Sequence, residues 1–226
     1  MVKSFSVIPY TKEEAILFFR EADLSQFKSR VVPLFGPNGA GKSTLIKGIE
    51  DHSIHIDRDD RDLEIFSYQN SRDNFKSRKA RNLFEEYDPR YMNARFDAQL
   101  VSEGQSVIYS MLDLLDGFMK NGQLKCENNH DYLVLLDEID SGISIDVIDF
   151  IMRKIKYIIK TRTDVQFIFS FNSPRVLKHF PQVLSMYDGK MIELHTEDDM
   201  LKVMNDHKKE FNKVRKKSNG RPKIYD

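Results

Sequence analysis

Residues 36–44 carry the pattern with the clearest chemical meaning: three glycines, a lysine and two hydroxyl residues between an apolar run at 31–35 and a helix-like segment at 45–49. Glycines let successive backbone N–H groups turn toward a phosphate, a lysine can reach the β- and γ-phosphates, and a serine hydroxyl can coordinate magnesium. A helix that begins at about Lys42 would add the positive end of its dipole to the same anion. The stretch therefore predicts a site for a nucleoside triphosphate with Mg²⁺, formed by Asn38, Gly39, Ala40, Gly41, Lys42, Ser43 and Thr44.

A pair of acids follows the apolar run 132–136, which is typical of a buried parallel strand. Asp137 would hold the magnesium through water. Glu138 would act as the general base that polarises the water attacking the γ-phosphate, and Lys42 belongs to the same catalytic set. Acid pairs also open ordinary solvated turns, and it is the combination with the loop at 36–44 that favours the catalytic interpretation.

A third segment, at 100–106, lies between these two and contains Ser102, Glu103, Gly104 and Gln105 ahead of an amphipathic stretch. Taken alone, Ser102 fits an ordinary N-cap that opens a helix. A serine hydroxyl, a glycine N–H and a helix N-terminus also form an anion site. With the two flanking motifs, the segment resembles the signature motif of the ABC ATPases and stands in the order expected for that family.

The resemblance to the ABC ATPases implies an α/β P-loop fold with a mostly parallel central sheet, an antiparallel N-terminal β region and a short helical lobe at about 70–125. It also implies a homodimer around ATP and Mg²⁺, in which Ser102, Gly104 and Gln105 of one copy meet the γ-phosphate held by the other. Gln69 matches the family's metal- and water-contacting glutamine, although a glutamine after a strand is also an ordinary surface residue. Tyr10 lies near the position of the adenine-stacking aromatic, where a core tyrosine fits equally well.

The departure from the family pattern comes after the strand-like run 165–171, where Asn172 stands in place of the switch histidine. An amide can donate a hydrogen bond to a γ-phosphate, but it cannot become positively charged or relay a proton. We expect Asn172 to join the catalytic set and Glu138 to drive a slow turnover. Residues 172–174 also fit a plain strand-ending turn that caps a helix.

Composition places these motifs in one domain, 1–226. Of the 226 residues 40% are hydrophobic, and 35 basic residues balance 35 acidic ones, so the net charge argues neither for nor against nucleic acid. The single cysteine, Cys126, excludes an internal disulfide and fits a reducing compartment. Because no apolar run is long enough to span a bilayer and no signal segment is evident, we expect a cytoplasmic protein.

Local patterns predict the remaining elements. We expect a strand at 4–8, a helix from Thr11 through about Ala22, a solvated charged connection at 52–62 and a helix with apolar residues at 148–159. Asp188 and Gly189 predict a hairpin turn. A final helix from about Glu197 should run into a basic tail at 208–226, which could contact phosphate backbones or be a solvated terminus.

Three functions are compatible with these motifs. The form Asp-Glu-Ile-Asp-Ser-Gly at 137–142 is similar to the DNA-repair and SMC-like branch, which favours a soluble, repair-like or defence-like ATPase that engages DNA, RNA or an effector protein. The first alternative is the nucleotide-binding subunit of an ABC transporter. The second is a nucleotide-gated switch with little hydrolysis, motivated by Asn172.

Overall fold

The computed structural model describes residues 1–6, 19–69, 103–119, 124 and 129–217, with the backbone alone at 103–107, 109–110 and 209–217. Six strands form the central sheet, in the order β5-β6-β7-β3-β8-β9. Their bounds are β3 Val31–Phe35, β5 Asp62–Gln69, β6 His130–Asp137, β7 Val165–Ser170, β8 Gln182–Ser185 and β9 Met191–Glu193. All neighbours in this sheet are parallel except β8 and β9, so the predicted mostly parallel sheet is confirmed.

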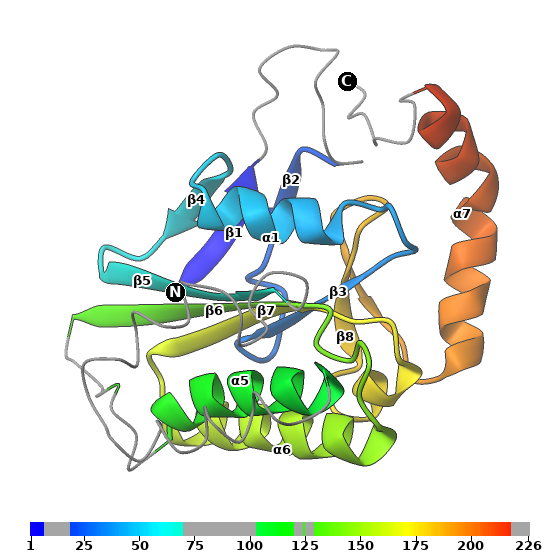
Figure 1. Ribbon diagram of the computed structural model, residues 1–226. Helices are drawn as coiled ribbons and strands as arrows, with labels where there is room; N and C mark the ends of the chain where they lie inside the picture. Colours follow the sequence, from blue (N-terminus) through cyan, green and yellow to red (C-terminus); the bar gives the residue numbers. More distant parts are fainter. Residues whose placement is uncertain (7–18, 70–102, 120–123, 125–128, 218–226) are drawn as a thin grey trace.

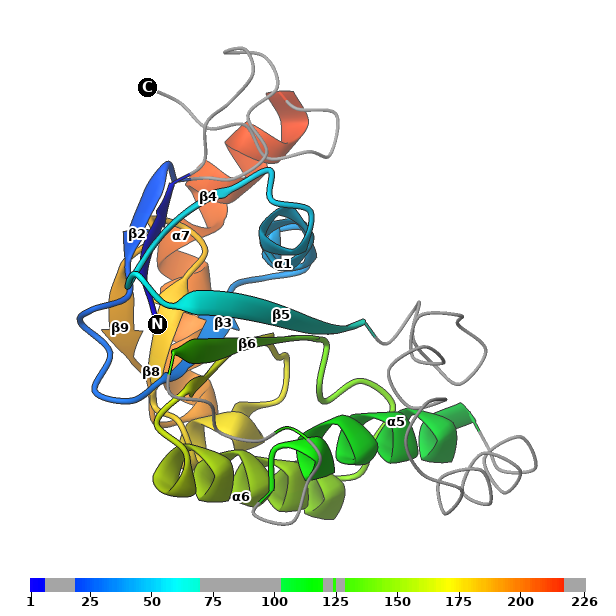
Figure 2. The same ribbon diagram turned by 90° about the vertical axis from the view of Figure 1, so that its left-hand side faces the viewer.

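Helices cover both faces of this sheet (Figures 1 and 2). On one face lie α5 (Glu103–Gly117) and α6 (Ile145–Thr161); on the other lies α1 (Lys42–Glu50) with a small antiparallel sheet. The small sheet has the order β2-β1-β4 and consists of β1 (Val2–Ser6), β2 (Glu21–Asp23) and β4 (His55–Arg58). The predicted antiparallel N-terminal β region is therefore confirmed.

Strand β6 explains why the acid pair follows a continuous apolar run. Val134 and Leu136 belong to the core on the α5 and α6 side, whereas Leu133 and Leu135 belong to the core on the α1 side. All four side chains are completely buried. A strand that is buried on both faces needs apolar residues at every position, which is the pattern of a central parallel strand.

Helix α6 is joined to the start of β3 by one arginine. The Arg30 guanidinium donates to the carbonyl oxygens of Ile159, Arg162 and Thr163, where α6 ends. These carbonyls have no partner within the helix, and a cation also suits the negative end of the helix dipole. The contact orients α6 relative to the strand that leads into the phosphate loop.

Two expectations for the N-terminal third are wrong. The helix expected through about Ala22 does not extend that far, because Ala22 lies in β2, opposite Phe5 of β1; residues 7–18 lie outside the described residues. The charged connection at 52–62 contains β4, in which Ile56 pairs with Phe5 on the other side. In both segments pairing with β1 overrides the local pattern, which is common for short strands.

The C-terminal third follows the predictions. Strands β8 and β9 form the hairpin around Asp188 and Gly189, and α7 spans Glu197–Lys217. Tyr187 stacks on His207 of α7 with ring centroids 4.4 Å apart, which attaches the helix to the hairpin. Residues 218–226 of the predicted basic tail lie outside the described residues.

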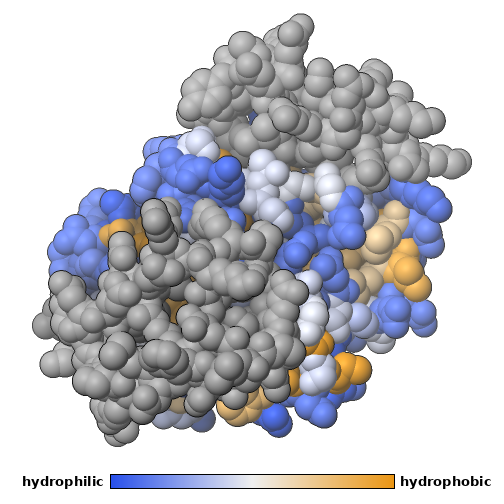
Figure 3. All heavy atoms as spheres, in the orientation of Figure 1, coloured by the Kyte–Doolittle hydropathy of each residue, from blue (hydrophilic) through white to orange (hydrophobic). Residues whose placement is uncertain are grey.

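The described surface is mostly hydrophilic, with apolar residues low in the view of Figure 3, where α6 runs in Figure 1. Ile145 and Phe150 are the most exposed large apolar side chains of α6. In the part of the chain that the structure describes, no helix combines the length and the apolar character that crossing a membrane requires.

Candidate functional site

The loop between β3 and α1 has the backbone that phosphate binding requires. Gly39 and Gly41 have φ angles of 84° and 89°, a left-handed region that only glycine enters without strain. Gly41 is the N-cap of α1 and leaves the helix start without a side-chain cap. The first N–H groups of a helix have no intrahelical partner, so an anion can accept from them.

Close packing explains the glycine that opens this loop. A Cβ atom on Gly36 would lie 2.9 Å from Cβ of Met186 and 3.0 Å from Cβ of Ala40. Both contacts are too short for a side chain. Gly36 therefore lets the loop fold closely over the end of β3, while Asn38, Ser43 and Thr44 stay exposed.

Lys42 is held inside this loop. Its side chain is only 7% exposed, and Nζ donates to the carbonyl oxygens of Gly36 at 2.6 Å and Pro37 at 3.4 Å, and to Oδ1 of Asn172 at 3.4 Å. Burial lowers the pKa of the Lys42 ammonium, and the nearby carboxylates, Asp137 first, raise it. A buried cation whose described hydrogen-bond acceptors are all neutral oxygen atoms is suited to an anionic ligand.

The acid pair lies across the site from Lys42 and is held by a serine. Ser170, the last residue of β7, is completely buried, and its hydroxyl donates to Asp137 Oδ1 at 2.5 Å. The same hydroxyl accepts the backbone N–H of Glu138 at 2.7 Å. The neighbouring strand therefore orients the Asp137 carboxylate.

Three strands bring these residues together. In the order β6-β7-β3, the acid pair ends β6, Asn172 follows β7, and the phosphate loop follows β3. Carboxyl ends of parallel strands meet at one edge of a sheet, which is the common place for a ligand in open α/β folds. The predicted Lys42, Asp137, Glu138 and Asn172 are thus brought to one edge.

The other predicted positions have mixed outcomes. Gln69 ends β5 in register with Asp137, but its amide donates to Glu50 at 3.2 Å, in the last turn of α1. Gly104 and Gln105 lie in the first turn of α5, where only the backbone is described. Ser102 and Tyr10 lie outside the described residues. The metal role of Gln69 and the role of the signature segment stay predictions.

Sequence reasoning missed Ser170 and Glu50. Ser170 is a polar residue directly after the apolar residues 167–169, and it marks the carboxyl end of a buried strand. Glu50 accepts from Ser67 at 2.7 Å as well as from Gln69. No local sequence signal relates Glu50 to β5, because the contact depends on how α1 lies over the sheet.

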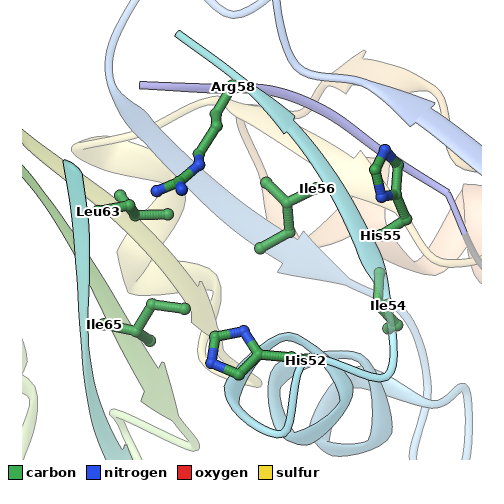
Figure 4. A pocket seen from close by; sticks show the side chains of 7 residues that line it. All are labelled: His52, Ile54, His55, Ile56, Arg58, Leu63 and Ile65. Atoms are coloured by element: carbon green, nitrogen blue, oxygen red, sulfur yellow. The ribbon is translucent and has the colours of Figure 1, made fainter. Parts of the chain in front are cut away.

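A separate cavity of about 270 Å³ lies where α1 ends, between β4 and β5 (Figure 4). Its walls are His52, Ile54, His55, Ile56, Arg58, Leu63 and Ile65. None of the predicted site residues lines it. Among the described residues, no group of three or more His, Cys, Asp or Glu side chains could hold a metal ion on its own.

Comparison with known proteins gives structural matches only. No family model and no curated protein matches the chain. The solved structure of cbiO1 from Clostridium perfringens, part of the ABC transporter complex cbiONQ, is 14% identical with a TM-score of 0.52 and covers 95% of this chain and 99% of that chain.

Two further solved structures are similar. MJ1267, an ATP-binding cassette of an ABC transporter, is 17% identical with a TM-score of 0.52, over 92% of this chain and 97% of that chain. The ATP-binding cassette MJ0796, in a dimeric post-hydrolysis state bound to ADP and Pi, is 15% identical with a TM-score of 0.52, over 85% and 97%. At these identities the matches show the fold, and this chain has the α/β fold of the ABC-type P-loop ATPases.

Proposed function

We propose that this chain binds ATP with Mg²⁺ and hydrolyses it slowly. The observation that carries the proposal is the convergence of four residues at one sheet edge: Lys42 within hydrogen-bond distance of Asn172, and Asp137 and Glu138 both joined to Ser170 of β7. A phosphate loop, an acid pair and a side-chain amide at the γ-phosphate position are the parts that phosphoryl transfer to water needs.

Each residue has a distinct role in this proposal. The N–H groups of residues 39–44 and the Lys42 ammonium bind the phosphates, and Lys42 is freed from the loop carbonyls as the phosphate oxygens replace them. Ser43 and Asp137 would hold Mg²⁺, which neutralises charge on the phosphate oxygens when bound. Glu138 accepts the proton of the attacking water, and Asn172 donates its amide N–H to the γ-phosphate.

Turnover should be slow because the Asn172 amide can donate a hydrogen bond but cannot carry a positive charge. A histidine at this position can carry a positive charge in the transition state, and an amide cannot. Lys42 remains the one cation of the described site near the γ-phosphate. The Glu138 carboxylate therefore provides the main rate enhancement.

A second copy of the chain is expected to complete the site. In this proposal Ser102, Gly104 and Gln105 of one copy contact the γ-phosphate bound to the other, so ATP joins the two copies and hydrolysis separates them. The dimeric state of the cassette MJ0796 supports this arrangement. The start of α5 offers the required anion-binding helix terminus.

The structural matches favour a transporter subunit over a nucleic-acid partner. Two of the similar structures are described as parts of ABC transporters, and nothing in the comparisons supports the DNA-repair or SMC-like interpretation. We therefore infer that ATP hydrolysis by this chain is coupled to a partner protein, and the membrane subunit of a transporter is the first candidate. Affinity capture with Glu138→Gln, compared with Lys42→Ala, should retain an integral membrane protein with ATP; retention of nucleic acid alone would contradict this inference.

Phosphate release and ATP binding test the enzymatic proposal. Lys42→Ala should weaken ATP binding by about 10- to 100-fold, because it removes charge-assisted hydrogen bonds to phosphate. Glu138→Gln should retain binding and lose about 100-fold or more in turnover. Asp60→Ala, an exposed acid outside the site, is the control. Wild-type phosphate release that Glu138→Gln leaves unchanged would show a contaminating activity and refute the proposal.

A further inference from the structure

Asp140, two residues after the proposed base, binds the backbone that carries Asn172. Its Oδ2 atom accepts the N–H of Asn172 at 2.7 Å and also the N–H of Ser173. Two successive N–H groups that point at one carboxylate oxygen form a small anion-binding concavity. The loop after β6 is thereby fastened to the loop after β7.

Further hydrogen bonds hold the backbone on both sides of this contact. The N–H of Ile139 donates to the carbonyl of Ser170 at 3.3 Å, which keeps Asp140 close to β7. Ser173 is the N-cap of the 3-10 helix η1 (Pro174–Lys178), and its hydroxyl accepts the N–H of Arg175 at 3.3 Å. Asp140 therefore holds Asn172 and Ser173, two of the three residues that lie between the end of β7 and the start of η1.

The side chain of Asn172 is the part of this loop that faces Lys42. Because a lysine ammonium can only donate, the atom of Asn172 at 3.4 Å from Lys42 Nζ must be the amide oxygen. The amide N–H atoms remain available to another acceptor. A shift of the Asn172 backbone by a fraction of an ångström would move this amide relative to the phosphate loop.

We propose that Asp140 is a positioning residue that holds the Asn172 amide at the γ-phosphate and so lets the site distinguish ATP from ADP. This inference rests on the proposed function. The carboxylate acts through the two backbone N–H groups and touches neither nucleotide nor water in the reaction. Its other oxygen, Oδ1, is buried and has no hydrogen-bond partner among the described residues, so these two N–H groups are its described contacts.

A competing explanation is that Asp140 acts only through its charge. Asp140 is one of the carboxylates that raise the pKa of Lys42 against the effect of burial. Asp140→Ala removes charge and hydrogen-bond acceptor together. Asp140→Asn removes the charge and keeps an oxygen that can accept both N–H groups, so the two variants separate the explanations.

ATP and ADP affinities in a Glu138→Gln background test the proposal without turnover. Asp140→Ala and Asn172→Ala should each lower the preference for ATP over ADP about three- to tenfold, the effect of one hydrogen bond. The combination of the two should be no worse than either alone, because both remove the same contact. Asp140→Asn should retain most of the preference, and Asp146→Ala, an exposed acid in the first turn of α6, should retain all of it.

Amide hydrogen exchange supplies a readout that needs no nucleotide. In Asp140→Ala the N–H groups of Asn172 and Ser173 should exchange about tenfold faster or more, whereas Asp146→Ala should leave them unchanged. Additive losses of ATP preference in the double variant would overturn the proposal. It would also be overturned if Asp140→Asn lost as much ATP preference as Asp140→Ala while the exchange of the two N–H groups stayed slow. If ATP does not bind at all, the proposed function fails, and the exchange rates alone decide whether Asp140 holds the loop.

Discussion

Glu138, the proposed general base, has a strained backbone. Its φ angle is 52°, in the left-handed region that a residue with a Cβ atom enters at a cost of about 1–2 kcal/mol. Ser170 and the turn in which Ser141 donates to the Glu138 carbonyl at 3.1 Å hold it there. Strained residues of this kind concentrate at active sites, because the surrounding structure fixes a side chain that an unstrained backbone would direct elsewhere.

Replacing Glu138 by glycine should separate stability from activity. Glu138→Gly relieves the strain and should raise the free energy of unfolding by about 1 kcal/mol relative to Glu138→Gln, which keeps the Cβ atom. Both variants should lose hydrolysis. Urea denaturation measures the difference, and a glycine variant that is less stable than the glutamine variant would show that the side chain matters to the fold.

At the scale of elements, the ends of β6 and β7 and the starts of α6 and η1 form one connected unit. Ser170 and Asp140 join the two strand ends, as described above. Behind them, Asp149 of α6 accepts from Arg175 Nε at 2.7 Å and interacts with His179 Nε2 at 2.9 Å. The position of Asn172 therefore depends on how α6 and η1 are held together.

The Asp149 contacts predict an acid-dependent loss of stability. Hydrogen bonds from Arg175, and then from His179, hold the pKa of the Asp149 carboxyl well below its ordinary value of 3.8. A lowered folded-state pKa stabilises the protein above the unfolded value, and this contribution is lost as the pH falls below it. Wild type should therefore be more stable than Asp149→Asn at neutral pH, and the difference should shrink as the pH falls below about 4.

Thermal unfolding between pH 3 and pH 7 checks this dependence. The exposed Asp60, replaced by asparagine, is the matched control and should show no such convergence with wild type. A difference between wild type and Asp149→Asn that stays constant across the range would mean that packing, and not the ionised carboxylate, accounts for the effect.

For the whole molecule, nucleotide-dependent association is the central expectation. The Glu138→Gln variant should form a dimer with ATP and Mg²⁺, because bound ATP persists between the two copies. ADP should leave it monomeric. Ser102→Arg in the same background should prevent dimer formation without loss of ATP binding, since it removes the hydroxyl proposed to contact the γ-phosphate and puts a much larger side chain between the two copies.

Size-exclusion chromatography with light scattering measures this association. Lys42→Ala should remain monomeric under all nucleotide conditions. A Glu138→Gln protein that binds ATP and nevertheless elutes as single molecules would remove the shared triphosphate from the proposal, and the chain would then act as a monomeric nucleotide switch.

Much of the fold could be predicted from local patterns. The runs at 31–35 and 132–136 are short and apolar throughout, and the run at 165–169 is apolar except for Gln166. Such runs form buried parallel strands because both faces of the sheet are covered. The turn at Asp188 and Gly189 and the helix with apolar residues over 148–159 were similarly recognisable, and the helix lies within α6. Strands β2 and β4 were not, because they are short edge strands whose pairing with β1 depends on residues distant in sequence.

The chemistry proposed for this chain could be predicted from local patterns: glycines, Lys42 and Ser43 in one loop, and Asp137 and Glu138 after a buried strand, predict a triphosphate site by their order along the chain. How these parts are held in place could be seen only in the folded chain. Ser170 and Asp140 join strand ends that lie more than thirty residues apart in the sequence, and the backbone strain at Glu138 is visible only in its φ angle. Contacts of this kind arise when parallel strands bring their carboxyl ends to one edge, and a linear pattern does not specify which side chains then meet.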